Sequence, residues 1–186
     1  MATEQVIEVP LRRYVIDSER SISAVLDGIF GGISQPDVPS LFAKLAASSS
    51  FEQFSTLVRQ AQGSAGLLRF FQLELEKALT LDPEALGWNG RRFVRLIAGN
   101  PLTMAKMTRH VAAAGSYAPV TILIEETTGG GTRVAYDSVA SAISPYGSIT
   151  ASEVARQLDL EVLNLLRHAT RAPSERETPK ASESDK

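Results

Sequence analysis

The run Gly99, Asn100 and Pro101 contains residue types that can bind an anion. Glycine adopts positive φ angles easily, asparagine caps helices with its side chain, and proline suits the first position of a helix. Together they predict a tight turn from a strand into a helix. The free backbone N–H groups and the positive end of the helix dipole at such a turn can hold a phosphate or a carboxylate. Two interpretations stay open, a structural turn and an anion or ligand site.

A second group of residues could transfer protons. His110 follows on the predicted helix, and a histidine side chain titrates near neutral pH. Tyr117, Glu125 and Tyr136 could converge near one end of the predicted sheet. The alternative for His110 is a structural role, with its ring bonded to a carbonyl group or a water molecule. The other histidine, His168, lies far along the last helix, so the sequence predicts no multi-histidine metal site.

Several catalytic signatures are missing from the sequence. It has no Gly-x-Ser-x-Gly, no His-Glu-x-x-His, no Walker lysine and no dinucleotide-binding glycine fingerprint. It contains no cysteine, which excludes disulfides, thiolate metal sites and cysteine nucleophiles. The three glycines at 129–131 lack a following lysine and are predicted to form a turn between two strands. Catalysis is therefore not the leading prediction, no metal is expected, and a cofactor stays unknown.

Charge and composition limit the partners of the chain. The net charge of -2 provides no general attraction for polyanions. The best basic cluster, Arg91, Arg92 and Arg95, splits over the two faces of a strand, so no nucleic acid is expected as a partner. The acidic start does not resemble a signal peptide, and no apolar run approaches the roughly 20 residues that cross a bilayer. The sequence predicts a cytoplasmic protein without a membrane partner.

Hydrophobic periodicity and turn residues predict how strands and helices follow one another. The expected elements are an edge strand within 6–16, a helix over 22–30, two helices between 36 and 66, a strand and then a short helix within 67–75, a strand over 92–98, a helix over 102–114, a hairpin of strands at 120–126 and 133–136, a short helix to 144 and a long helix over 150–169. Methionines 104 and 107 are expected in the core, although such side chains can also line an apolar pocket.

Capping residues predict where several of these helices begin. Ser18 is expected to cap the first helix. Asp137 or Ser138 is expected to cap the short helix after the hairpin, with Asp137 favoured as a cap over a role in a site. Thr150 and Glu153 are predicted to form a capping box before the last helix. In such a box, each side chain accepts a hydrogen bond from the backbone N–H of the other residue.

These elements predict an α+β domain over residues 1–170, with a small mixed or antiparallel sheet and helices packed on it. Residues 37–66 form a helical insertion, and residues 150–169 form a C-terminal helix. From Arg171 onward Pro, Ser, Glu and Lys dominate, and no large apolar residue occurs. Such a segment buries too little surface to offset the entropy of ordering, so 171–186 is predicted to be a disordered tail.

The chain resembles the bacterial family called domain of unknown function 302. The residues that carry the resemblance are the Gly99-Asn100-Pro101 turn, the strand that Pro119 leads, the glycine turn and Val134-Ala135-Tyr136-Asp137. The likeness extends loosely over 14–144. It implies a small α+β domain, commonly dimeric, with no established activity. Members often carry a histidine just after the Phe-rich strand, where this sequence has Glu74-Leu75.

The leading functional hypothesis is a non-catalytic, homodimeric domain that binds a small molecule or an anion. Its candidate ligand-binding residues are Gly99, Asn100, Pro101, His110, Tyr117, Glu125 and Tyr136. A second hypothesis is a cofactor-independent enzyme that uses His110 with Tyr117 or Glu125 for proton transfer. A third hypothesis is a protein–protein interaction module that presents the helices of the insertion or the last helix. The sequence does not predict which ligand binds.

Overall fold

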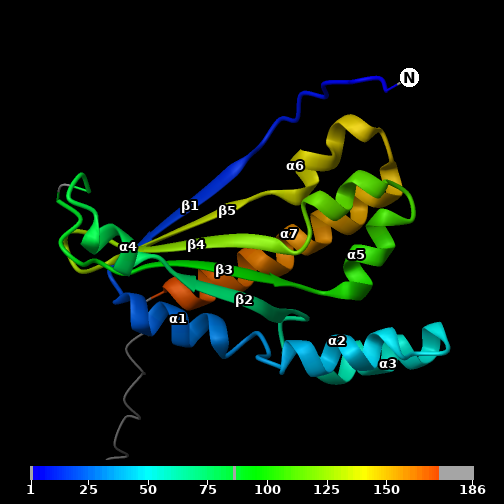
Figure 1. Ribbon diagram of the computed structural model, residues 1–186, viewed down its shortest axis with the longest axis horizontal. Coiled ribbons are helices and arrows are strands. Elements are labelled where there is room, and N and C mark those ends of the chain that lie inside the picture. Colours follow the sequence, from blue (N-terminus) through cyan, green and yellow to red (C-terminus); the bar gives the residue numbers. More distant parts are fainter. Residues whose placement is uncertain (1, 86, 172–186) are drawn as a thin grey trace, which may run out of the picture.

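A computed structural model describes residues 2–85 and 87–171 of the protein. Its centre is a five-stranded sheet with the strand order β1-β5-β4-β3-β2, and every neighbouring pair of strands is antiparallel (Figure 1). The strands are β1 (Arg13–Ser18), β2 (Leu68–Glu74), β3 (Phe93–Gly99), β4 (Val120–Glu126) and β5 (Thr132–Asp137). The α+β class is therefore confirmed, and the sheet is antiparallel rather than mixed.

Helices accompany the sheet along the described part of the chain. They are α1 (Ile22–Phe30), α2 (Val38–Ala46), α3 (Phe51–Ala61), α4 (Glu76–Leu81), α5 (Pro101–Thr108), α6 (Val139–Ile143) and α7 (Ile149–Thr170), with 3₁₀ turns η1 (Ala112–Ser116) and η2 (Ser144–Tyr146). The long helix α7 crosses one face of the sheet and contacts α1, α5 and α6 (Figure 1). Helices α2 and α3 lie within the predicted insertion and pair with each other.

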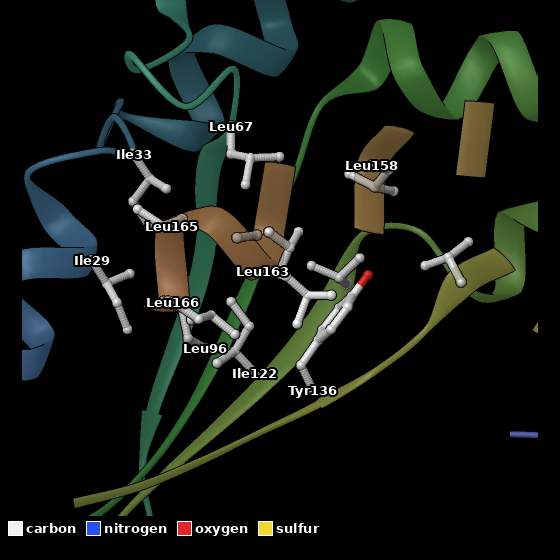
Figure 2. Packing of buried hydrophobic residues seen from close by; sticks show 14 of the residues in the cluster. Ile29, Ile33, Leu67, Leu96, Ile122, Tyr136, Leu158, Leu163, Leu165 and Leu166 are labelled. Carbon is white, nitrogen blue, oxygen red and sulfur yellow. The ribbon is translucent and has the colours of Figure 1, made fainter. Parts of the chain in front are cut away.

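The core lies between the sheet and α7. Because successive side chains of a strand point to opposite faces, Leu96 of β3 and Ile122 of β4 both face this helix and are fully buried. Figure 2 shows them beside Ile29 of α1 and Leu166 of α7, which belong to the same cluster. A second, smaller cluster joins α2 and α3 to the start of β2. No helix among the described residues has the length and apolar character needed to cross a membrane.

The predicted caps of two helices are wrong. The side chain of Ser21, not Ser18, caps α1 by accepting a hydrogen bond from Ala24 N. Ser18 instead ends β1 and donates its hydroxyl to Thr170 O at 2.6 Å. Likewise Ser148 caps α7, so the predicted box of Thr150 and Glu153 does not start this helix. Where several polar residues precede a helix, tertiary packing decides which one stands in the extended conformation that a cap requires.

The short helix after the hairpin is capped by Ser138, one of the two residues predicted as its cap. Ser138 caps α6 and accepts a hydrogen bond from Ser141 N at 3.1 Å. Asp137, the other residue predicted as a cap, is still part of β5 and forms an ion pair with Arg13, with Nε and Oδ1 2.7 Å apart. Because β5 continues through Asp137 to pair with β1, the cap is Ser138, the second of the two alternatives.

The strand predicted within 6–16 begins later in the structure. Its partner β5 ends at Asp137, and the chain then turns into α6, so no strand lies opposite the residues before Arg12. The last backbone link is a hydrogen bond from Ser138 N to Arg12 O at 2.9 Å. An antiparallel strand extends only as far as its partner does, and β1 is therefore confined to Arg13–Ser18.

The helix predicted over 102–114 is shorter than expected. Helix α5 ends at Thr108, and the chain continues through the 3₁₀ turn η1. The Thr108 hydroxyl donates to Met104 O at 3.0 Å, a local bond that competes with continuation of the helix. The new direction of the chain buries Val111 and Ala114. The predicted tail at 171–186 lies outside the described residues, apart from Arg171.

One buried carboxylate joins α7 to β5 and α6. Asp159 is 7% exposed and accepts four hydrogen bonds. The donors are the hydroxyls of Tyr136 and Ser138, both at 2.6 Å, and the backbone N–H groups of Val139 and Ala140, at 2.9 and 3.2 Å. These N–H groups open α6 and would otherwise have no partner within the helix. Asp159 thus fixes the end of the sheet to the longest helix.

We expect the substitution Asp159→Ala to lower the free energy of unfolding by roughly 2–5 kcal/mol, because it leaves several buried donors without an acceptor. Asp159→Asn should cost less than Ala but still destabilise, since an amide offers one oxygen where the carboxylate offers two. Urea denaturation measures both. The exposed Glu153→Gln on the same helix is the control and should stay within about 0.5 kcal/mol of wild type. Equal stability of all three variants would show that Asp159 has no such role.

Candidate functional site

An apolar cavity of about 310 Å³ opens at the turn between β3 and α5. Its wall includes Gly99, Asn100 and Pro101, the residues that the sequence singled out. The remaining lining comes from α2, β2, α5, α7 and the start of β4: Val38, Phe42, Phe70, Thr103, Met104, Ala118, Pro119, Val120 and Leu158. Asn100 and Thr103 are the polar residues of this lining, so the wall of the cavity is mainly apolar.

Asn100 has a structural role at this turn. Its Oδ1 accepts a hydrogen bond from Leu102 N at 2.9 Å, which caps α5 as predicted. Its Nδ2 donates to Gln62 Oε1 at 2.9 Å and to Gly66 O at 2.7 Å. These bonds join the loop after α3 to the start of α5. The amide is therefore occupied by the protein itself, and it holds the cavity wall in place.

Gly99 is required for space and not for a special backbone angle. Its φ is not among the positive values of the described chain, contrary to the expectation from the turn motif. A Cβ atom at this position would lie 3.1 Å from both Cα and Cβ of Pro119 and 3.2 Å from Cε2 of Phe70. The peptide bond between Ala118 and Pro119 is cis. The short distances from a Cβ atom at Gly99 to Pro119 show that the end of β3 and the residue before β4 approach each other too closely for a side chain at Gly99.

Aromatic and thioether side chains form part of the cavity wall. The rings of Phe42 and Phe70 meet edge to face, with centroids 5.8 Å apart and an interplanar angle of 70°. Phe42 is 47% exposed although it belongs to this apolar wall. Met104 lines the cavity, whereas Met107 is fully buried in the core and does not line it. Sequence analysis missed Phe42, Phe70 and Leu158 as site residues, because they come from elements distant in the sequence.

The predicted proton-transfer residues occupy separate surroundings. His110 is exposed and accepts a hydrogen bond from Arg109 Nε at 3.2 Å. A hydrogen bond with Tyr146 raises the pKa of Tyr117. Glu125 lies on the sheet face opposite the core, where its Oε1 is 3.8 Å from Arg133 Nη1. The structure therefore does not gather His110, Tyr117 and Glu125 around one cavity.

Tyr136, the last candidate residue, faces the core. It is 1% exposed, and its ring stacks on that of Tyr14 with centroids 6.5 Å apart. Figure 2 shows the ring reaching from β5 into the core. Burial raises the pKa of the Tyr136 hydroxyl, and the neighbouring Asp159 carboxylate raises it further. The hydroxyl donates its hydrogen bond to Asp159 and belongs to the framework of the fold.

The basic cluster predicted to be split is indeed distributed over different contacts. Arg92 forms an ion pair with Glu74, with Nη2 and Oε2 3.3 Å apart. The guanidinium of Arg91 lies 4.8 Å from the ring centroid of Trp88. Arg95 is exposed on the sheet face opposite the core. Among the described residues, no group of three or more His, Asp or Glu side chains is arranged to hold a metal ion.

Comparisons with known proteins support the resemblance seen in the sequence. The family model described as domain of unknown function DUF302 matches residues 43–165. A crystal structure of an uncharacterised conserved DUF302 protein from Bacillus stearothermophilus has a similar fold, with a TM-score of 0.56 and 14% sequence identity. The match covers 86% of this chain and 98% of that chain. At this identity the likeness concerns the fold alone. A search of curated proteins gave no match.

We expect Gly99→Ala to destabilise the protein by roughly 1–3 kcal/mol, because the added methyl group would crowd backbone and ring atoms that have little room to move. Chemical denaturation measures the loss. Gly129→Ala is the matched control, since a Cβ there has no heavy atom within 4 Å. If the two variants lost the same stability, the close approach of β3 and β4 at Gly99 would not be the cause.

The raised pKa of Tyr136 predicts a loss of stability at alkaline pH. A phenol in the unfolded chain ionises near about pH 10, whereas the buried one keeps its proton to higher pH. The stabilisation is complete below the unfolded pKa and is lost as the pH rises above it, because the unfolded state then releases the proton. The unfolding free energy of wild type should fall faster than that of Tyr136→Phe, by up to about 1.4 kcal/mol per pH unit. Parallel curves in urea denaturation would contradict this.

Proposed function

We propose that this chain, which belongs to the DUF302 family of domains of unknown function, binds a small, uncharged, apolar molecule in the cavity beside Gly99. The supporting observation is a cavity of about 310 Å³ whose wall is almost entirely apolar. Ligand pockets in proteins start at roughly 300 Å³, and an apolar cavity of about 150 Å³ already binds benzene. The cavity is thus large enough for a one- or two-ring aromatic compound or a short aliphatic chain.

The composition of the wall favours this ligand class over the anion considered from the sequence. Among the described residues no Lys, Arg or His side chain lines the cavity. The Asn100 side chain, which could have met an anion, is bonded to Leu102, Gln62 and Gly66. An anion would therefore lose its hydration without gaining a charged partner, which is unfavourable in an apolar site.

Binding without catalysis is the role that we propose for this cavity. His110 and Glu125 do not line it, and neither does Tyr117. A general acid or base must reach the substrate within hydrogen-bond distance, directly or through one water molecule. The polar side chains of the wall, Asn100 and Thr103, are neutral and do not titrate in the ordinary pH range. We further propose that the domain acts in the cytoplasm as a homodimer.

The two internal methionines provide a direct test with indole and toluene as probes. In protein labelled with ¹³C at the methionine methyl groups, the Met104 resonance should shift on titration, because this side chain lines the cavity. The Met107 resonance should stay in place, since its side chain is buried elsewhere in the core. Inorganic phosphate and acetate should move neither signal. A shift with phosphate but not with indole would favour an anion site instead.

A side chain that fills the cavity should weaken the binding of indole. Thr103 is half-buried in the wall, so we expect Thr103→Trp to occupy the space and reduce the affinity for indole at least about 10-fold. Lys106→Trp on the exposed side of the same helix is the control and should bind indole like wild type. Isothermal titration calorimetry measures both affinities. Equal binding by the two variants would place the ligand outside this cavity.

A further inference from the structure

The outer edge of β1 presents unpaired backbone groups. Strand β1 has β5 as its neighbour in the sheet, and in the described part of the chain no strand lies on its other side. The carbonyl oxygen of Arg12 accepts from Ser138 N at 2.9 Å, so the backbone groups of residue 12 point toward the β5 side. Because this direction alternates along an antiparallel strand, the N–H and C=O groups of Arg13, Val15 and Asp17 point outward. Such an edge is a template for pairing with another chain.

The opposite edge of the sheet is less open to pairing. Strand β2 contains a bulge between Arg69 and Phe71, and a bulge twists an edge and interrupts its ladder of hydrogen bonds. Ser34 also forms an isolated bridge with Leu68, and Arg69 N donates to Ser34 O at 2.9 Å. The start of β2 is therefore already partnered by the protein itself. Strand β1 carries neither of these protections.

We propose that β1 pairs with β1 of a second copy of this chain, in an antiparallel arrangement centred on Val15. In this register Val15 lies opposite the partner's Val15, and Arg13 lies opposite the partner's Asp17. The two-fold axis runs perpendicular to the sheet, so the core face of one copy continues into the core face of the other. The inference names the surface of the homodimer proposed above and does not depend on the ligand, because the cavity adjoins β2, β3 and β4.

The side chains of β1 are complementary to themselves in this register. Arg13 is bound to Asp137 within the chain, with Nε and Oδ1 2.7 Å apart, and Asp17 is bound to Arg133 at the same distance. Pairing would extend these ion pairs into a row of alternating charges across the two copies. Val15, which is 52% exposed, would become covered by its counterpart. Opposite charges directly across an antiparallel pair stabilise it.

Other registers lack this complementarity. A shift of one residue would place the core face of one copy beside the open face of the other. A shift of two residues would set Val15 against Arg13 or Asp17, which pairs an apolar side chain with a charged one. The core side of the edge also favours pairing. Leu160 is 52% exposed and lines a cleft together with Tyr14. In the proposed register, Tyr14 lies opposite the partner's Ile16.

The chain of 186 residues should be a dimer in sedimentation-velocity experiments over a dilution series, and Val15→Glu should convert it into a folded monomer. Two glutamates on the two-fold axis would repel each other and lose water on pairing, so the dimer Kd should rise by roughly 100-fold or more. Phe71→Glu is the matched control. Phe71 lies on the same face of the opposite edge strand and is 53% exposed, compared with 52% for Val15, so this variant should remain dimeric.

A mixing experiment separates loss of pairing from loss of folding. Val15→Glu and Val15→Lys should each be monomeric, and an equimolar mixture should form a one-to-one heterodimer, because opposite charges then meet at the axis. Native mass spectrometry identifies this species by its mass. A monomeric wild type, a dimeric Val15→Glu, a monomeric Phe71→Glu or a mixture that stays monomeric would each overturn the proposed β1 interface. None of these outcomes bears on indole binding, which Thr103→Trp and its control Lys106→Trp test separately.

Discussion

The Asp159 carboxylate accepts hydrogen bonds from a strand residue, from a cap and from the first turn of α6, and it does so from the middle of the longest helix. A buried charge is tolerable only where its hydrogen bonds are complete, and here four donors surround it. The same contacts fix the position of α7 across the sheet and the direction in which the chain leaves β5. Leu158, the neighbouring residue on α7, contributes to the cavity wall, so the site also depends on this placement.

The cavity results from a second constraint, the close approach of β3 and β4 at Gly99 and Pro119. Asn100 strengthens this corner because it binds the loop after α3 while it caps α5. These contacts hold the wall of the cavity in place, so the cavity is present in the protein by itself. The sheet thus serves separate purposes in separate places: one face packs the core, the ends of three strands border the cavity, and the β1 edge stays unpaired within the chain.

Sequence reasoning predicted the parts of the fold that neighbouring residues control. The Gly99-Asn100-Pro101 turn, the α1 helix and the hairpin of β4 and β5 are all where local patterns placed them. The errors concern boundaries that distant contacts decide, such as the start of β1, which depends on where β5 ends. Of the candidate site residues, the turn lines the cavity, whereas His110, Tyr117, Glu125 and Tyr136 do not. Their spacing in the sequence contained no information about which face of the sheet or helix each would occupy.

By itself, the sequence determined the α+β class, the cap at Asn100 and the absence of cysteine chemistry, because propensity, capping and composition act over a few residues. Only the tertiary structure decided that Asp159 is buried and accepts four hydrogen bonds, whereas the sequence alone does not distinguish it from a solvent-exposed acidic residue of an amphipathic helix. The same holds for Phe42, Phe70 and Leu158, which meet around one cavity although they lie on three separate elements. Burial and long-range contact depend on how the elements pack together, and no local pattern records that packing.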